Sequence, residues 1–147
     1  MAIVDQLNDD LKAAMRSGDK TAVATIRGLK SMLRDKEIEK NDALTEDEEI
    51  KVLSTAAKQR REAIESYELG GRDDLVQQEQ AELKVIEQYL PEQMDTVEIE
   101  SLADEVIAEV GAESMRDMGR VMGAIMPRIQ GKADGSEVQS IVKQKLS

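Results

Sequence analysis

The sequence of 147 residues contains no cysteine, histidine, phenylalanine or tryptophan, and its aromatic residues are two tyrosines, Tyr67 and Tyr89. Without cysteine no disulfide can form, so nothing indicates a secreted, disulfide-stapled domain. Without cysteine and histidine there is no Cys/His zinc site and no histidine general base. The scarcity of aromatic rings excludes the base-stacking platform of sheet-based RNA-binding folds.

Long apolar segments are also absent, and negative charge dominates. No run of 18 apolar residues occurs, and residues 1–7 contain neither a basic region nor a long apolar core. The net charge of −11 disfavours non-specific binding to nucleic acid or to an anionic membrane. We therefore expect a soluble, cytoplasmic protein with no membrane partner and no DNA partner.

Apolar residues recur at helical spacing through most of the chain, and no segment alternates as a strand would. Local start and stop signals divide these residues into helices. The expected helix starts are Asp19, the capping box Thr45–Glu48, Asp73, Ser114 and the capping box Ser136–Gln139. The expected stops are Ser17-Gly18, Asn41-Asp42, Gly70-Gly71, Pro91 and Gly111.

These signals predict an all-α fold with two parts. Residues 1–90 are expected to form an N-terminal multihelical unit with a long helical hairpin, residues 91–96 a linker, and residues 97–147 a C-terminal three-helix bundle. Residues 91–115 contain eight acids and no Lys or Arg, whereas residues 116–147 contain six basic and three acidic residues. A contact with a polyanion is therefore expected near the C-terminal end.

The segment 117–135 has a composition unlike the rest of the chain, with four glycines, three methionines and one proline. Each glycine inside a helix costs roughly 1 kcal/mol relative to alanine. On a helical wheel, Gly119 and Gly123 lie side by side at the edge of the apolar arc. Something at these two positions is therefore expected to need the missing side chain.

Arginines flank the two glycines on this wheel. Arg116 and Arg120 lie next to them, and Arg128 lies on the far side of the polar face. Two interpretations stay open: a neighbouring helix packs closely on the glycines, or bare backbone beside guanidinium groups docks a phosphate backbone or a partner protein. The methionines, Met122 among them, fit either core packing or an adaptable surface.

Two further basic segments allow alternative interpretations. Gly131–Gly135 fits a turn between helices with a left-handed glycine, or an anion site at the last helix with Lys132 nearby. Lys58–Arg61 fits a solvated face whose charges pair with Glu62 and Glu65, or a nucleic-acid patch.

Catalytic signals are scarce. No Ser/Lys spacing matches a familiar amidase or lactamase site, and no Gly-rich phosphate loop follows a strand. The Gly-x-x-x-Gly spacing of Gly119 and Gly123 occurs in membrane helix pairs, but the neighbouring arginines exclude that setting. No catalytic residue, metal ligand or cofactor is predicted, and catalysis by this chain alone is not expected.

Several segments resemble the YqeY family, essentially from end to end. They are Lys58–Arg61, Asp74-Leu75, Glu79, Tyr89–Gln93, Ala108–Ala112, Asp117–Gly123 and Gly131–Gly135. That family is similar to the C-terminal tail of GatB, the B subunit of the glutamine-dependent aspartyl/glutamyl-tRNA amidotransferase, where the tail contacts tRNA. The resemblance implies a helical N-terminal unit and a three-helix C-terminal unit. It also implies an association with carbon–nitrogen ligases that use glutamine as amido-N-donor.

The sequence therefore predicts a stand-alone, non-catalytic helical module. Its expected partner is tRNA or a tRNA-handling enzyme such as a tRNA-dependent amidotransferase or synthetase. The candidate contact residues are Arg116, Gly119, Arg120, Met122, Gly123, Arg128, Gly131 and Lys132. The alternatives are a protein–protein adaptor with no RNA contact and a component of a carbon–nitrogen ligase activity.

Overall fold

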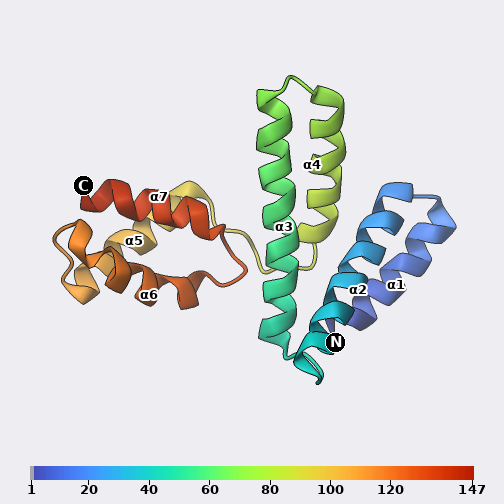
Figure 1. Ribbon diagram of the computed structural model, residues 1–147, viewed down its shortest axis with the longest axis horizontal. Coiled ribbons are helices and arrows are strands. Elements are labelled where there is room, and N and C mark those ends of the chain that lie inside the picture. Colours follow the sequence, from blue (N-terminus) through green and yellow to red (C-terminus); the bar gives the residue numbers. More distant parts are fainter. Residues whose placement is uncertain (1) are drawn as a thin grey trace. The chain divides into compact units, whose positions relative to one another are not determined.

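A computed structural model describes residues 2–147, and every regular element in that range is a helix (Figure 1). The elements are α1 (Ile3–Ser17), α2 (Lys20–Lys40), α3 (Glu46–Leu69), α4 (Asp73–Glu87), α5 (Thr96–Val110), the 3-10 turn η1 (Met115–Asp117), α6 (Met118–Ile129) and α7 (Gly135–Leu146). The prediction of an all-α fold is confirmed.

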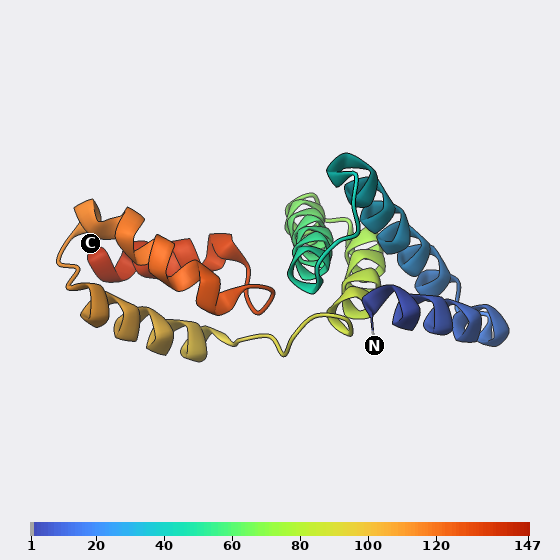
Figure 2. The ribbon, with the colours of Figure 1, turned by 90° about the horizontal axis from the view of Figure 1, so that it is seen from below.

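The chain forms two compact units, Met1–Leu90 and Pro91–Ser147. In the first, α1 packs on α2 and the long helices α3 and α4 form an antiparallel hairpin (Figure 1). In the second, α5, α6 and α7 each contact the other two, and the segment that leads into α5 is extended (Figure 2). Each unit has its own apolar core.

The core of the first unit is aliphatic, as the composition requires. Its largest fully buried side chains are Leu7, Ile26, Leu29, Leu53 and Ile86. The one aromatic ring in this core is that of Tyr89, whose hydroxyl donates a hydrogen bond to the Asp10 carboxylate of α1. Burial of the phenol and the nearby carboxylate raise the Tyr89 pKa.

Most helix ends follow the local signals. Gly18, Asn41 and Gly111 adopt the left-handed backbone conformation that ends α1, α2 and α5, with φ of 76°, 60° and 67°. At the start of α2, the Asp19 side chain accepts a hydrogen bond from the Ala22 amide. These residues act within one turn of the chain, which is why the sequence alone predicts them.

Two expected helix starts are wrong. Asp73 is the first residue of α4 instead of its cap, because Arg72 takes the cap position and its guanidinium pairs with Asp74 at 3.2 Å. The capping box at Ser136 does not form either. Asp134 caps α7 by accepting a hydrogen bond from the Ser136 amide, so the helix begins two residues earlier.

The basic cluster Lys58–Arg61 belongs in part to the hairpin interface. The Nε atom of Arg60 lies 3.5 Å from a carboxylate oxygen of Glu79 and 3.1 Å from one of Glu82, both on α4. Arg60 is therefore half-buried between helices and is not on the solvated face expected from the sequence. Burial and the negative charge of Glu82 raise the pKa of Glu79.

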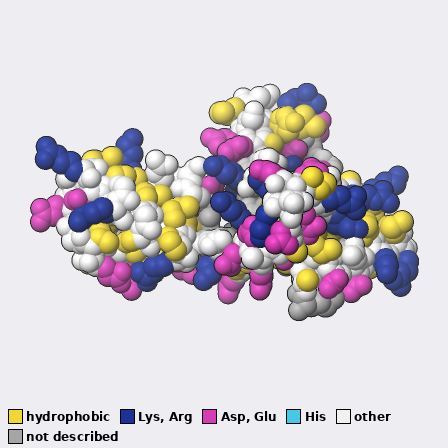
Figure 3. Space-filling model, turned by 60° about the horizontal axis from the view of Figure 1, so that its bottom comes forward, with side chains coloured by type: hydrophobic (Ala, Val, Ile, Leu, Met, Phe, Trp, Pro, Cys, Tyr) yellow, Lys and Arg dark blue, Asp and Glu magenta, His cyan; other side chains and the backbone are white. Residues whose placement is uncertain are grey.

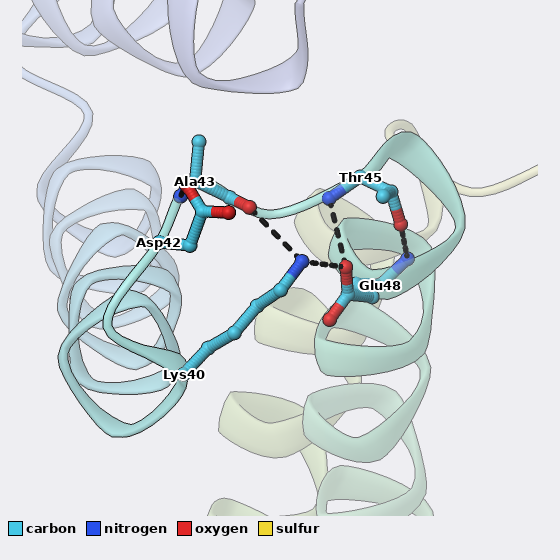
Figure 4. Close-up of polar contacts among 5 residues, drawn as sticks. All are labelled: Lys40, Asp42, Ala43, Thr45 and Glu48. Atoms are coloured by element: carbon cyan, nitrogen blue, oxygen red, sulfur yellow. Dashed lines mark hydrogen bonds and ion pairs between the residues drawn. The ribbon is translucent and has the colours of Figure 1, made fainter.

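A capping box at the start of α3 is linked to the end of α2 by hydrogen bonds (Figure 4). The Thr45 hydroxyl accepts from the Glu48 amide at 3.2 Å, and the Glu48 carboxylate accepts from the Thr45 amide at 3.1 Å. Lys40 at the end of α2 donates to the same carboxylate at 2.5 Å and to the Ala43 carbonyl at 3.1 Å. The Lys40 hydrogen bond, followed by those from Thr45, lowers the pKa of Glu48 to about 2.

Among residues 2–147, no helix combines the length and the apolar character that crossing a bilayer requires.

Thr45→Ala is expected to destabilise the first unit by about 1 kcal/mol, because the Glu48 amide loses its acceptor at the start of α3. Urea unfolding followed by circular dichroism measures this change. Thr45→Ser, which keeps the hydroxyl, is the matched control and should unfold close to the original protein. Equal stability of the alanine and serine variants would show that the cap contributes nothing.

The lowered pKa of Glu48 predicts an acid-sensitive contribution to stability. The ionised carboxylate stabilises the fold fully above its ordinary pKa of 4.5, and this contribution is lost as the pH falls towards about 2. Glu48→Gln should therefore melt below the original protein at neutral pH, and the difference in melting temperature should shrink in acid. A difference that does not depend on pH contradicts the assignment.

Candidate interaction surface on α6

The apolar face of α6 fixes the rotation of this helix in the C-terminal unit. Val121, Ile125 and Ile129 are at most 1% exposed and lie in one core with residues of α5 and α7. Met118 and Met122 are partly buried against the same core, so these two methionines serve packing. The opposite face of α6 consequently points to solvent.

The start of α6 is held by a polar turn. The Ser114 hydroxyl accepts from the Arg116 amide at 3.3 Å, and the Asp117 carboxylate accepts from the Glu113 amide at 2.8 Å. The hydrogen bonds that the Asp117 carboxylate accepts from the Glu113 and Ser114 amides lower its pKa. Ser114 thus acts as a cap, as expected, but it caps the 3-10 turn η1 that precedes the helix.

Gly119 and Gly123 both lie on the solvent-facing side of α6 and are exposed. A Cβ atom added at either position would meet no other part of the described chain within 4 Å. The interpretation that these glycines let a neighbouring helix of the C-terminal unit pack closely is therefore wrong. The backbone at both positions is bare and accessible.

Pro127, which lies within α6, adds a second feature to this face of the helix. Proline has no amide hydrogen, so the carbonyl oxygen of Gly123, four residues earlier, lacks its usual helical donor. Both residues are exposed. The bare backbone at Gly123 therefore offers a hydrogen-bond acceptor, and a proline within a predicted helix was the signal that could have revealed it.

The three arginines differ in how far they are neutralised. Arg120 lies 3.3 Å from the Asp117 carboxylate and donates to the Val110 carbonyl at 3.0 Å. Arg128 lies 3.3 and 3.2 Å from the carboxylates of Glu105 and Glu109 on α5.

The Arg116 side chain, by contrast, has no ion pair among residues 2–147. Of the three guanidinium groups predicted to bind a partner, only that of Arg116 forms no ion pair with an acid of the described chain.

Gly131 and Lys132 form the turn after α6. Gly131 has a φ of 74°, which confirms the left-handed glycine. Its carbonyl accepts from the Gln93 side chain at 2.6 Å, and the Lys132 carbonyl accepts from the Met94 amide at 2.8 Å. The turn therefore fastens the segment before α5 to the end of α6.

The anion-site interpretation of this turn is not favoured. The Asp134 carboxylate already accepts from the Ser136 amide at the start of α7, where an anion would bind. The Lys132 side chain is exposed and has no ion pair among the described residues.

We define the α6 strip as the exposed residues on this face of α6 and its entry turn. They are Met115, Arg116, Gly119, Arg120, Gly123, Met126 and Pro127. Met115 and Met126 are 41% and 40% exposed, and both belong to the exposed large hydrophobic side chains of the described chain. In Figure 3 hydrophobic side chains form a band across the part of the surface to which α5–α7 belong, at the left of the view.

Of the predicted contact residues, Arg116, Gly119, Arg120 and Gly123 lie on the α6 strip. Met122 is half-buried towards the core, and Arg128 faces α5. Residues 2–147 hold no group of three or more Asp, Glu, His or Cys side chains suited to a metal ion.

Comparison with known sequences returns one family and a group of fungal relatives. The model of the family described as Yqey-like protein matches residues 4–146. A protein of Pyrenophora tritici-repentis named "Altered inheritance of mitochondria protein 41, mitochondrial" is 34% identical over 141 residues, covering 94% of this chain and 77% of the relative.

Proteins with the same name give similar matches. The relative from Vanderwaltozyma polyspora is 29% identical over 95% of this chain and 79% of its own length. The relative from Eremothecium gossypii is 40% identical over 57% of this chain and 46% of its own length.

These names contradict the predicted cytoplasmic location, because the relatives are designated mitochondrial. The prediction was wrong because it relied on missing cysteine and missing apolar segments. The absence of cysteine and of long apolar segments argues against a secreted or a membrane-spanning protein. It does not distinguish the cytoplasm from another reducing, aqueous compartment.

Gly119→Ala and Gly123→Ala are each expected to stabilise the C-terminal unit by up to about 1 kcal/mol, because alanine favours the helix and its Cβ has free space. Chemical unfolding measures this gain. Gly111→Ala is the control: it has free space too, but its φ of 67° should make alanine cost about 1 kcal/mol or more. Destabilisation at 119 or 123 would contradict the open geometry.

Proposed function

The chain belongs to the YqeY-like protein family, and from that premise we propose that it is a non-catalytic helical module that docks on tRNA or on a tRNA-handling enzyme. The α6 strip is the proposed contact surface.

One observation carries the proposal: the bare backbone at Gly119 and Gly123 faces solvent. Each glycine costs the helix roughly 1 kcal/mol, and no neighbouring part of the described chain needs the space. A partner that approaches the helix backbone closely explains why both positions lack a side chain. The cost in stability is then offset by contact with another molecule.

The tRNA version draws on charge and on family resemblance. Arg116 belongs to the α6 strip and Lys132 follows α6, and neither cation forms an ion pair with an acid of the described chain. Unpaired cations beside accessible backbone suit phosphate groups. The resemblance of this family to the tRNA-contacting tail of GatB supports the same assignment.

A protein adaptor without RNA is the second candidate, and specific contacts favour it. Arg120 and Arg128 are already neutralised by Asp117, Glu105 and Glu109, which reduces attraction for phosphates. The spare acceptor at the Gly123 carbonyl suits an amide or hydroxyl donor of a protein. The carbon–nitrogen ligase alternative rests on family association alone, and we do not propose it.

Arg116→Glu combined with Lys132→Glu is expected to weaken tRNA binding about tenfold, equivalent to about 1.4 kcal/mol. These positions are preferable to Arg120 and Arg128, whose reversal would also break internal ion pairs. Electrophoretic shifts across a salt series measure the effect, and log affinity should fall linearly with log salt. Lys12→Glu with Lys143→Glu has the same net charge and should bind like the original protein.

Affinity capture with and without nuclease separates the two candidates. A tRNA-mediated partner is lost when RNA is destroyed, whereas an adaptor keeps its protein. If both charge-reversed pairs bind tRNA equally, the RNA version is wrong. If Gly119→Ala and Gly123→Ala stay folded and keep every captured partner, the α6 strip is not the contact surface.

A further inference from the structure

The corner between α2 and α3, in the N-terminal unit, contains a surface cavity of about 430 Å³. Its lining residues are Lys36, Glu39, Lys40, Leu44, Glu48, Lys51, Val52 and Thr55. This volume falls within the range of small-molecule sites in proteins. The function proposed above does not use the cavity.

The charges that line the cavity do not cancel. Lys36 pairs with Glu39 at 3.3 Å, and Lys40 pairs with Glu48 at 2.5 Å. Lys51 is the third lysine of the lining, and it has no ion pair among residues 2–147. The cavity therefore carries one uncompensated positive charge, although the whole protein has a net charge of −11.

The cavity also has an apolar part. Val52 belongs to the buried core, and Leu44 packs partly buried against that core. The Thr55 hydroxyl already donates to the Lys51 carbonyl at 3.0 Å, so it is engaged within α3. A ligand in this cavity thus meets aliphatic groups together with a single free ammonium.

The corner is held in shape before any ligand arrives. Lys40 ties the end of α2 to the Ala43 carbonyl and to Glu48, and Glu48 closes the capping box with Thr45 (Figure 4). Glu48 is ionised at neutral pH, so its ion pair with Lys40 persists there. Because the Lys40 and Glu48 side chains are already held in place, binding a ligand costs less conformational entropy.

We propose that this cavity binds a small organic anion, a carboxylate or phosphate monoester with a short apolar body. The anionic group pairs with Lys51, whose compact ammonium acts as a point charge. The apolar body lies against Leu44 and Val52. A cationic or neutral ligand of the same shape lacks the ion pair.

Amide chemical shifts of the full chain, measured by NMR at constant ionic strength, test this site. The probes are hexanoate, hexyl phosphate and hexylammonium. Hexanoate or hexyl phosphate should shift the amides of Leu44, Lys51, Val52 and Thr55, and the stronger of the two identifies the preferred head group. Hexylammonium should leave these amides unchanged.

Two variants sharpen the test. Lys51→Met should weaken anion binding about threefold, the scale of one exposed ion pair.

Lys58→Met is the matched control, since Lys58 lies on the same helix, is exposed and does not line the cavity. The proposal is overturned if Lys51→Met and Lys58→Met bind the anions equally, if hexylammonium shifts the same amides, or if neither anion shifts any of them.

Discussion

Burial of Val121, Ile125 and Ile129 is the constraint on which the C-terminal unit depends. These side chains are nearly inaccessible, and together they fix which face of α6 meets α5 and α7. Once that face is fixed, the position of every other α6 residue follows from the helical repeat. Gly119 and Gly123 are exposed for this reason, and not because any local interaction turns them outward.

Ion pairing then decides which positive charges of the C-terminal unit remain available. The acidic helix α5 neutralises Arg128 through Glu105 and Glu109, and Asp117 neutralises Arg120. A local excess of basic residues along the sequence therefore overstates the positive potential of the folded surface. Arg116 and Lys132 are the cations near α6 that keep their charge uncompensated by acids of the described chain.

Several segments that carry the family resemblance serve packing. Arg60 of the Lys58–Arg61 segment pairs with Glu79 across the α3–α4 hairpin, and Tyr89 donates to Asp10. Gln93 donates to the Gly131 carbonyl, which joins two resemblance segments in one contact. Buried or half-buried polar groups need such partners, so their residue types are restricted even without any role in binding.

The sequence by itself determined the helices and most of their ends, because Gly18, Asn41, Thr45 and Gly111 act within one turn of backbone. The sequence also determined that the glycines and arginines of residues 116–128 share the polar side of one helix, because the helical repeat is itself a local property. Only the tertiary structure decided that no helix of the C-terminal unit packs on Gly119 and Gly123, and that Arg128 pairs with the acids of α5. Those outcomes depend on residues of other helices brought close by core burial, and the spacing of residues along one helix contains no information about them.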